Sequence, residues 1–297
     1  MKTIKIAIAN NKGGIGKTST TLGIVSGIRQ LQPDAKILIV DSDEQSCIKT
    51  SFSVKLSQAE GGLAAVLMDG VQPENLAIQV RPNLDVILSG GRLMREFEKN
   101  YQKTPNADFI ISECFKNVTR YDYIFFDTPP AFSLLTSNIL LYCNYLIIPC
   151  TLDLFGYMGM KNTVSFMHTL KEHFSGKNWP LAKILGVVPT MFDQRRNMDL
   201  DTLQDLDNYI NVKREIPDEG ARVFEPIRQD MKVKSSQVKR KLLHEFAPTS
   251  KAADDYLTLS KAILKMLDIQ GSETSPDSGK IHRVNQKLNT PTSEASL

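Results

Sequence analysis

Short apolar runs alternate with longer amphipathic segments along most of the chain. Residues 4–9 and 36–41 have the β-branched, apolar pattern of buried strands, and residues 18–31 between them have the length and closing turn of a helix. Further strands are predicted at 84–88, 123–127, 145–149 and 184–188, and further helices at 106–119, 157–174 and 198–210. Strands joined through a helix run parallel, so the pattern predicts an α/β fold with a doubly wound, mostly parallel sheet flanked by helices.

A change of composition near residue 270 divides the chain into a body and a tail. Residues 1–270 carry the alternating pattern and are predicted to form a single domain. Residues 271–297 are polar, with few large apolar side chains. Such a segment cannot bury enough surface to offset the entropy lost on ordering, so we expect a disordered tail.

Composition narrows the class of protein further. The chain has 36 basic and 33 acidic residues and a net charge of +3, too small to indicate a nucleic-acid partner by itself. The four cysteines contain no Cys-x-x-Cys pair, and the four histidines have no metal-ligand spacing. No apolar stretch is long enough to span a membrane. These features argue against a disulfide framework and a cysteine-bound cluster, and we expect a cytoplasmic protein.

A glycine-rich segment lies between the first predicted strand and the first predicted helix. Its sequence, Asn11-Lys12-Gly13-Gly14-Ile15-Gly16-Lys17-Thr18, departs from the phosphate-binding pattern G-x-x-x-x-G-K-[ST] only where Asn11 replaces glycine. Glycines let backbone N–H groups converge on phosphate oxygens, and the positive end of the following helix faces the same anion. We expect Lys17 to reach the β- and γ-phosphates and Thr18 to ligate Mg²⁺. The segment predicts a P-loop NTPase.

Acidic residues follow two of the predicted strands. Asp41 and Asp43 end one strand, and Asp127 ends another. An Asp at a strand end beside a P-loop can hold Mg²⁺ through water, which fits Asp127. If the two strands are neighbours, Asp41 or Asp43 lies near enough to orient the attacking water.

These segments together resemble the ParA family of partition ATPases, in the MinD/ParA branch of P-loop proteins with a deviant Walker A motif. The mark of that branch is a second lysine early in the loop, and Lys12 matches it. Asp41-Ser42-Asp43-Glu44-Gln45 is similar to the family's D-x-D-P-Q segment, and residues 121–130 and 134–138 are similar to its Walker B region. Thr190-Met191-Phe192-Asp193, followed by Arg195, is similar to another segment of the family.

The resemblance implies specific roles for the site residues. Lys12 is expected to reach the phosphates of a partner subunit in an ATP-bound homodimer, and Asp43 to act on the attacking water. The catalytic residues it implies are Lys12, Lys17 and Asp43, with Thr18 and Asp127 holding Mg²⁺. The nucleotide-binding set is Lys12, Gly13, Gly14, Ile15, Gly16, Lys17, Thr18, Ser19 and Asp127. Two departures occur nearby, since Glu44 replaces the usual proline and Ser46-Cys47 replaces the common Gly-Asn pair.

Basic residues gather in the C-terminal third of the body. Residues 232–241 carry five cations and no acid. Non-specific DNA binding needs only phosphate contacts, and the family resemblance implies a basic surface for nucleoid DNA. The candidate DNA-binding residues are Arg195, Arg196, Arg222, Arg228, Lys232, Lys234, Lys239, Arg240 and Lys241. A solvated helix face is the simpler interpretation of the same charges.

The resemblance therefore implies a cytoplasmic, nucleoid-associated ATPase that uses ATP and Mg²⁺. ATP would drive dimerisation and non-specific DNA binding, and a ParB-like partner would stimulate weak hydrolysis during plasmid or chromosome segregation. Two alternatives stay open. A relative that positions a non-DNA cargo would have the same body, and a MinD-like protein would bind a membrane through an amphipathic terminal helix, for which 252–269 has the apolar spacing.

Overall fold

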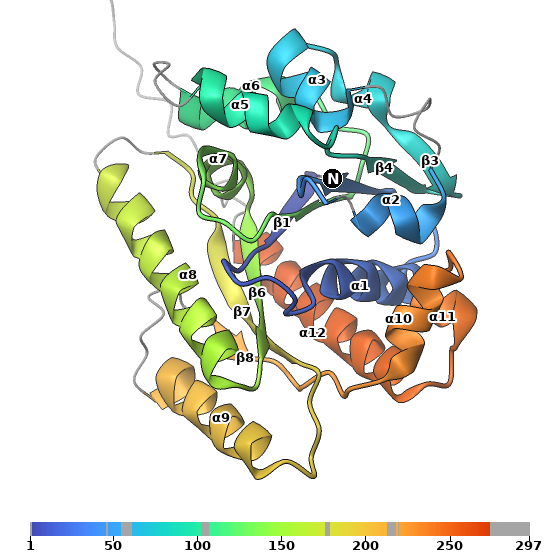
Figure 1. The fold of residues 1–297 in the computed structure, drawn as a ribbon, viewed down its shortest axis with the longest axis vertical. Helices are drawn as coiled ribbons and strands as arrows, with labels where there is room; N and C mark the ends of the chain where they lie inside the picture. The colour runs from blue at the N-terminus through green and yellow to red at the C-terminus, as the bar shows by residue number, and fades with distance from the viewer. Residues whose placement is uncertain are drawn as a thin grey trace, which may run out of the picture.

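A β-sheet runs through the molecule (Figure 1). It has eight strands in the order β3-β4-β2-β5-β1-β6-β7-β8. The computed structural model describes residues 2–45, 47–54, 61–101, 107–175, 179–212, 218 and 220–273. Its strands are β1 (Ile4–Ile8), β2 (Ile37–Asp41), β3 (Ile78–Arg81), β4 (Leu84–Ile87), β5 (Tyr123–Asp127), β6 (Tyr145–Thr151), β7 (Lys183–Thr190) and β8 (Arg222–Val223). All neighbours are parallel except β3 and β4. The predicted fold class is confirmed.

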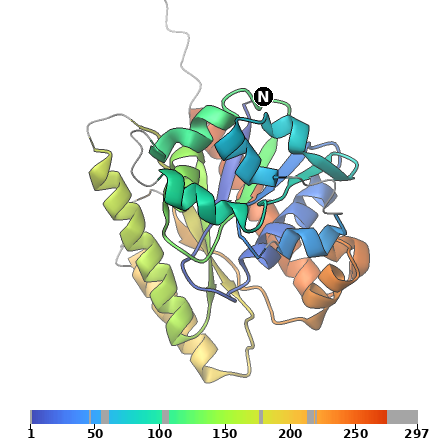
Figure 2. The same cartoon turned by 45° about the horizontal axis from the view of Figure 1, so that its top comes forward.

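Helices cover both faces of this sheet (Figure 1). They are α1 (Lys17–Leu31), α2 (Cys47–Phe52), α3 (Gly62–Asp69), α4 (Pro73–Leu76), α5 (Leu93–Tyr101), α6 (Ile110–Phe115), α7 (Leu134–Tyr142), α8 (Leu154–His173), α9 (Asn197–Asp207), α10 (Met231–Val238), α11 (Leu243–Phe246) and α12 (Lys251–Glu273). Figure 2 shows α8 and α9 along one side of the molecule and the α10–α11 pair on the opposite side. The helix predicted over 106–119 is shorter: a 3₁₀ turn at Ala107–Phe109 precedes α6.

Two apolar layers form the core, one on each face of the sheet. Alternate residues of a strand point to opposite faces, so Ala7 packs with α3, α5, α6, α7 and α8, whereas Ile6 and Ile8 pack with α1 and α12. The central strands are buried on both faces, which explains why their sequences are continuously apolar.

Helix α12 packs closely against α1. A Cβ at Gly23 of α1 would lie 2.4 Å from the Tyr256 ring, and one at Gly27 would lie 2.2 Å from Ser260 Oγ, so glycine is required at both positions. Tyr256 and Ile263 are buried in this contact. The amphipathic segment that the sequence leaves open as a membrane-binding element is thus part of the core. None of the described helices is both long and apolar enough to cross a bilayer.

The same helix passes the expected end of the domain. It continues to Glu273, three residues beyond the boundary predicted at 270. The rest of the expected tail, 274–297, lies outside the described residues, and its disorder stays a prediction.

Candidate nucleotide-binding site

Three neighbouring strands bring the P-loop and the acidic strand ends to one edge of the sheet. Strand β5 lies between β1 and β2, with Asp127 paired in register with Ile8 on one side and Asp41 on the other. The loop that follows β1 therefore lies directly beside both acidic ends. The condition under which Asp41 or Asp43 lies near the site, that β2 and β5 are neighbours, is therefore met.

The conformation of the loop explains which of its residues are glycine. Gly14 and Gly16 have left-handed backbone angles, with φ of 76° and 90°. Asn11 is outside the left-handed region, so glycine is not needed where the usual pattern has it. The Asn10 side chain holds the beginning of the loop, because its Nδ2 donates to the Pro149 oxygen at 2.8 Å and its Oδ1 accepts from the Lys12 amide at 3.0 Å.

A buried cation and a buried carboxylate form the centre of the site. Lys17 and Asp127 are 7% and 1% exposed. The Thr18 hydroxyl donates to Asp127 Oδ2 at 2.6 Å, and the Thr21 hydroxyl lies 3.2 Å from Oδ1. Burial lowers the pKa of Lys17, against the opposing charges of Asp127 and Asp43. Burial raises the pKa of Asp127 to about 6, although Thr18 and Lys17 favour its charged form.

The donor atoms of this centre suit a magnesium nucleotide. A hydroxyl and a carboxylate are hard oxygen ligands of the kind that Mg²⁺ prefers. A Cβ at Gly13 or Gly14 would meet no atom within 4 Å, so the space above the loop is open. Thr18 and Asp127 would hold the metal, and the loop amides with Lys17 would hold the phosphates.

The second acidic strand end lies at the rim of the same site. Ser42 is fixed to β5, because its amide and hydroxyl both donate to the Asp127 backbone oxygen, at 3.0 and 2.7 Å. The next amide, of Asp43, donates to Asp41 Oδ1 at 3.1 Å. Asp41 is buried, whereas Asp43 is half-buried and open to an incoming group. Asp43 is thus the better placed of the two to contact a water molecule at a bound phosphate.

Glu44, the residue that replaces the usual proline, faces away from this centre. Its carboxylate accepts from Arg95 Nε of α5 at 2.5 Å. Cys47, which follows three residues later at the beginning of α2, is exposed. Ser46 lies outside the described residues.

The two loop lysines have contrasting surroundings. The Lys17 ammonium donates to the Lys12 backbone oxygen at 2.9 Å, within the loop itself. Lys12 is exposed, and its Nζ lies 4.8 Å from the centroid of the Phe155 ring on α8. Thr190, at the end of β7, holds the loop from the other side by donating to the Ile15 oxygen at 2.9 Å.

The candidate DNA-binding residues lie in separate places. Arg195 and Arg196 are in the loop between β7 and α9, where Asp193 accepts two hydrogen bonds from the exposed Arg195 side chain, at 2.8 and 2.6 Å. Arg222 is exposed on the edge strand β8. Arg228 is bound by Asp255 of α12 through contacts of 2.6 and 3.0 Å, which gives it a structural role.

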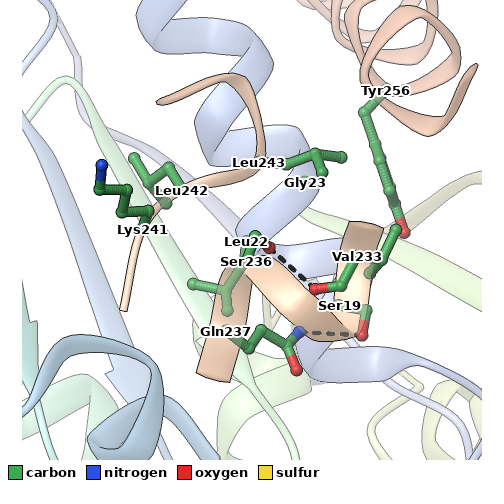
Figure 3. A pocket seen from close by; sticks show the side chains of 10 residues that line it. All are labelled: Ser19, Leu22, Gly23, Val233, Ser236, Gln237, Lys241, Leu242, Leu243 and Tyr256. Carbon is green, nitrogen blue, oxygen red and sulfur yellow. Dashed lines mark hydrogen bonds between the residues drawn. The ribbon is translucent and has the colours of Figure 1, made fainter. Parts of the chain in front are cut away.

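The remaining five cations form the α10 surface, which we define as Lys232, Lys234, Lys239, Arg240 and Lys241. All five are exposed. Helix α10 contacts the phosphate-binding helix, because Gln237 Nε2 donates to Ser19 Oγ at 3.1 Å (Figure 3). Ser19 directly follows Thr18, so one hydrogen bond joins the α10 surface to the nucleotide site.

Several contacts of the site were not predicted from the sequence. Asn10, Thr21, Phe155 and Gln237 belong to no phosphate-binding pattern, and their partners are distant along the chain. Of these four, Thr21 could have been predicted from the sequence, because it lies one helical turn after Lys17 and therefore faces the same strand end.

Comparison with known proteins agrees with this site. A family model described as an AAA domain matches residues 2–179. A virulence plasmid ParA family protein of Chlamydia psittaci is 28% identical over 266 residues, covering 89% of this chain and 94% of that protein. The sporulation initiation inhibitor protein Soj of Bacillus subtilis is 25% identical over 261 residues, covering 87% and 97%.

A solved structure has the same fold. A plasmid partition protein of Borrelia burgdorferi, bound to the ATP analogue AMPPNP, superposes with a TM-score of 0.70 at 23% identity, covering 89% of this chain and all of that one. The P-loop, the second lysine and the acidic strand ends described above lie within the matched domain. The chain therefore belongs to the AAA domain family, and the relatives it matches over most of its length are ParA-type ATPases.

Proposed function

We propose that this ATPase binds Mg–ATP at the P-loop, dimerises around it and then holds DNA non-specifically until hydrolysis releases both. The observation that carries the proposal is the pairing of a buried Lys17–Thr18–Asp127 centre with an exposed Lys12 in the same loop. The residues of a buried centre can contact only the nucleotide bound in the same subunit. An exposed lysine beside that centre can contact a nucleotide bound in a second subunit.

The side chains divide the work of hydrolysis. Mg²⁺ would neutralise phosphate charge at Thr18 and Asp127. Lys17 would hold the β- and γ-phosphates, and Lys12 would bring a second positive charge from the partner subunit. Asp43 would orient the water for in-line attack on the γ-phosphate, because its half-buried carboxylate lies at the rim of the site. ATP contacts both subunits only in the dimer and therefore shifts the population toward it.

DNA would be held at the α10 surface. Its five cations are exposed. Within the described part of the chain, Lys232 alone of the five lies near an aromatic ring, with its Nζ 5.9 Å from the centroid of Phe246. Flexible exposed lysines suit phosphate contacts without base specificity. Arg195 and Arg196 would add phosphate contacts from the separate loop between β7 and α9, where Asp193 binds the Arg195 side chain as Asp255 binds that of Arg228. The release step would be accelerated by a ParB-like protein bound to the plasmid or chromosome, and the ATPase would reside on the nucleoid.

The experiment that tests the proposal separates hydrolysis from binding. Asp43→Ala should bind ATP and dimerise normally, yet release phosphate at least 50-fold more slowly than the unmodified chain, by the order of magnitude that such water-positioning groups contribute. Consequently its ATP dimer should stay on DNA. Glu44→Gln is the matched control, because this neighbouring carboxylate faces Arg95 and its loss should leave phosphate release within about twofold.

Two results would contradict the proposal. Phosphate release by Asp43→Ala at the normal rate would remove Asp43 from the mechanism. A stable ATP dimer of the same variant with no affinity for DNA would favour a ParA-type ATPase that positions another cargo.

A further inference from the structure

The Lys12 ammonium is held by an aromatic ring. Its Nζ lies 4.8 Å from the centroid of the Phe155 ring, and among the described residues no carboxylate forms an ion pair with Lys12. A cation placed over a ring face is attracted by the ring's negative quadrupole. Phe155 is therefore the group that determines where this exposed side chain lies in the free subunit.

The position of the ring is set by close backbone packing. Asp153 caps α8, accepting from the Gly156 amide at 2.8 Å, so the first turn of the helix is fixed. A Cβ at Gly159 would lie 3.2 Å from the Lys12 Cβ, which shows that α8 lies directly against the loop. The first turn of α8 thus fixes the position of the Phe155 ring, and the Lys12 side chain adopts the conformation that places its ammonium over the ring.

Exposure indicates that this contact can be exchanged. Phe155 and the preceding Leu154 are each 65% exposed, an unusual state for two large apolar side chains in one helical turn. Lys17, by contrast, is buried and bonded within the loop. Water can replace the ring around the Lys12 ammonium, whereas it cannot reach Lys17 in the same way.

We propose that Phe155 is a positioning residue that holds the Lys12 ammonium on α8 in the nucleotide-free subunit and releases it when the ATP-bound dimer forms. The release half rests on the proposed function, in which Lys12 serves the partner's phosphates. Because an exposed contact of this kind is weak, we expect removal of the ring to favour dimerisation by about two- to fivefold for each subunit, or about 4- to 25-fold in the dimer dissociation constant.

The resting contact can be observed directly by NMR. With ¹³Cε-labelled lysine in the full chain, the Lys12 Hε signals, assigned with Lys12→Arg, should be shifted upfield by the ring current of Phe155. Phe155→Leu should remove this shift, while Leu154→Ala should leave it, since Leu154 has the same exposure and no aromatic ring. Absence of an upfield shift in the nucleotide-free chain would overturn the proposal.

The release is tested by adding Mg–AMPPNP. We expect the upfield shift to disappear as the dimer forms, and Phe155→Leu to dimerise at an about 4- to 25-fold lower protein concentration in analytical ultracentrifugation. Phe155→Tyr keeps the ring and should dimerise like the unmodified chain. A shift that persists in the dimer, or a Phe155→Leu dimer that is unchanged or weaker, would overturn the release.

These experiments distinguish a failure of the Phe155 proposal from a failure of the proposed function. If the shift is present without nucleotide and no dimer forms with Mg–AMPPNP, the proposed function fails while the resting contact stands. If the dimer forms and the shift is absent throughout, the proposed function survives and Phe155 has no positioning role.

Discussion

The nucleotide site and the α10 surface differ in whether their charged side chains are buried or exposed. The charges of the nucleotide site, Lys17 and Asp127, are buried and bonded to the loop and to α1. The charges of the α10 surface are exposed and turned to solvent. A buried charge must be paired or hydrogen-bonded, so its position is determined by the fold. An exposed charge stays hydrated wherever it lies on the surface, so the fold does not determine its position. Its role is defined by the ligand that binds it.

This contrast determines how strongly each region responds to substitution. Single substitutions in the nucleotide site should have large and specific effects, because each group there has several partners. Single substitutions in the α10 surface should have small effects that add, because its members act independently through phosphate contacts.

The strongest test of this contrast is the pair of loop lysines. Lys17→Ala should weaken ATP binding at least 100-fold, because it removes the buried cation that faces the phosphates. Lys12→Ala should weaken binding to the single subunit by less than tenfold, since its ammonium lies over Phe155 and outside the buried centre. Titration of each variant with a fluorescent ATP analogue measures both. Equal losses would abolish the distinction between the two lysines.

The next largest expected effect is the change in the free energy of unfolding with pH that the ionisation of Asp127 causes. Its pKa rises from 3.8 in the unfolded chain to about 6 in the folded one, so the folded chain binds more protons between these values and loses stability as the pH rises through them. Asp127→Asn removes this loss. The stability of the variant relative to the unmodified chain should therefore increase by about 2.5 kcal/mol from pH 4 to pH 7.5.

This effect is measured by urea unfolding of the nucleotide-free protein at several pH values. The change with pH is the informative quantity, because the amide alters the hydrogen bonds of Thr18 and Thr21 equally at every pH. A stability difference that does not vary with pH would mean that Asp127 is ionised in the folded chain at the usual acidic pH.

The α10 surface should respond in small, similar steps. Lys234→Ala, Lys239→Ala and Lys241→Ala, combined in one chain, should reduce the slope of log affinity for DNA against log salt by about 0.9 for each lysine that contacts a phosphate. Arg228→Ala should instead lower stability by about 1 kcal/mol through the lost ion pair with Asp255, with little change in the slope. Filter binding at several salt concentrations and urea unfolding distinguish the two outcomes. A change of slope in Arg228→Ala alone would reverse the assignment.

The smallest expected effect is at the junction of the two regions. Gln237→Leu keeps the volume of the side chain and removes the hydrogen bond to Ser19 (Figure 3). Its DNA affinity should depend at most about fivefold less on the bound nucleotide, because a single hydrogen bond contributes about 1 kcal/mol. Lys241→Gln is the control, since it alters the same end of the α10 surface and leaves the hydrogen bond between Gln237 and Ser19 in place. An unchanged ratio of ATP-state to ADP-state affinity would show that this bond carries no coupling.

The sequence predicted the centre of the molecule far better than its edges. Strands β1, β2 and β5 are buried on both faces, so their apolar runs are continuous and each was predicted within one residue. Strand β8 has two residues and β3 is an antiparallel edge, and neither leaves such a run. Likewise the P-loop follows from local spacing, because its glycines meet local backbone needs. Contacts such as Lys12 with Phe155 or Ser19 with Gln237 join residues 143 or more positions apart, which no local pattern can indicate.

The most direct test of the account is binding to a random-sequence DNA duplex with ATP, with ADP and without nucleotide, each at low and at moderate salt. We predict binding only with ATP, weakened steeply by salt, because the nucleotide assembles the dimer and the α10 surface holds the phosphates. Absence of DNA binding in all three states, with ATP still bound at the P-loop, would contradict the account.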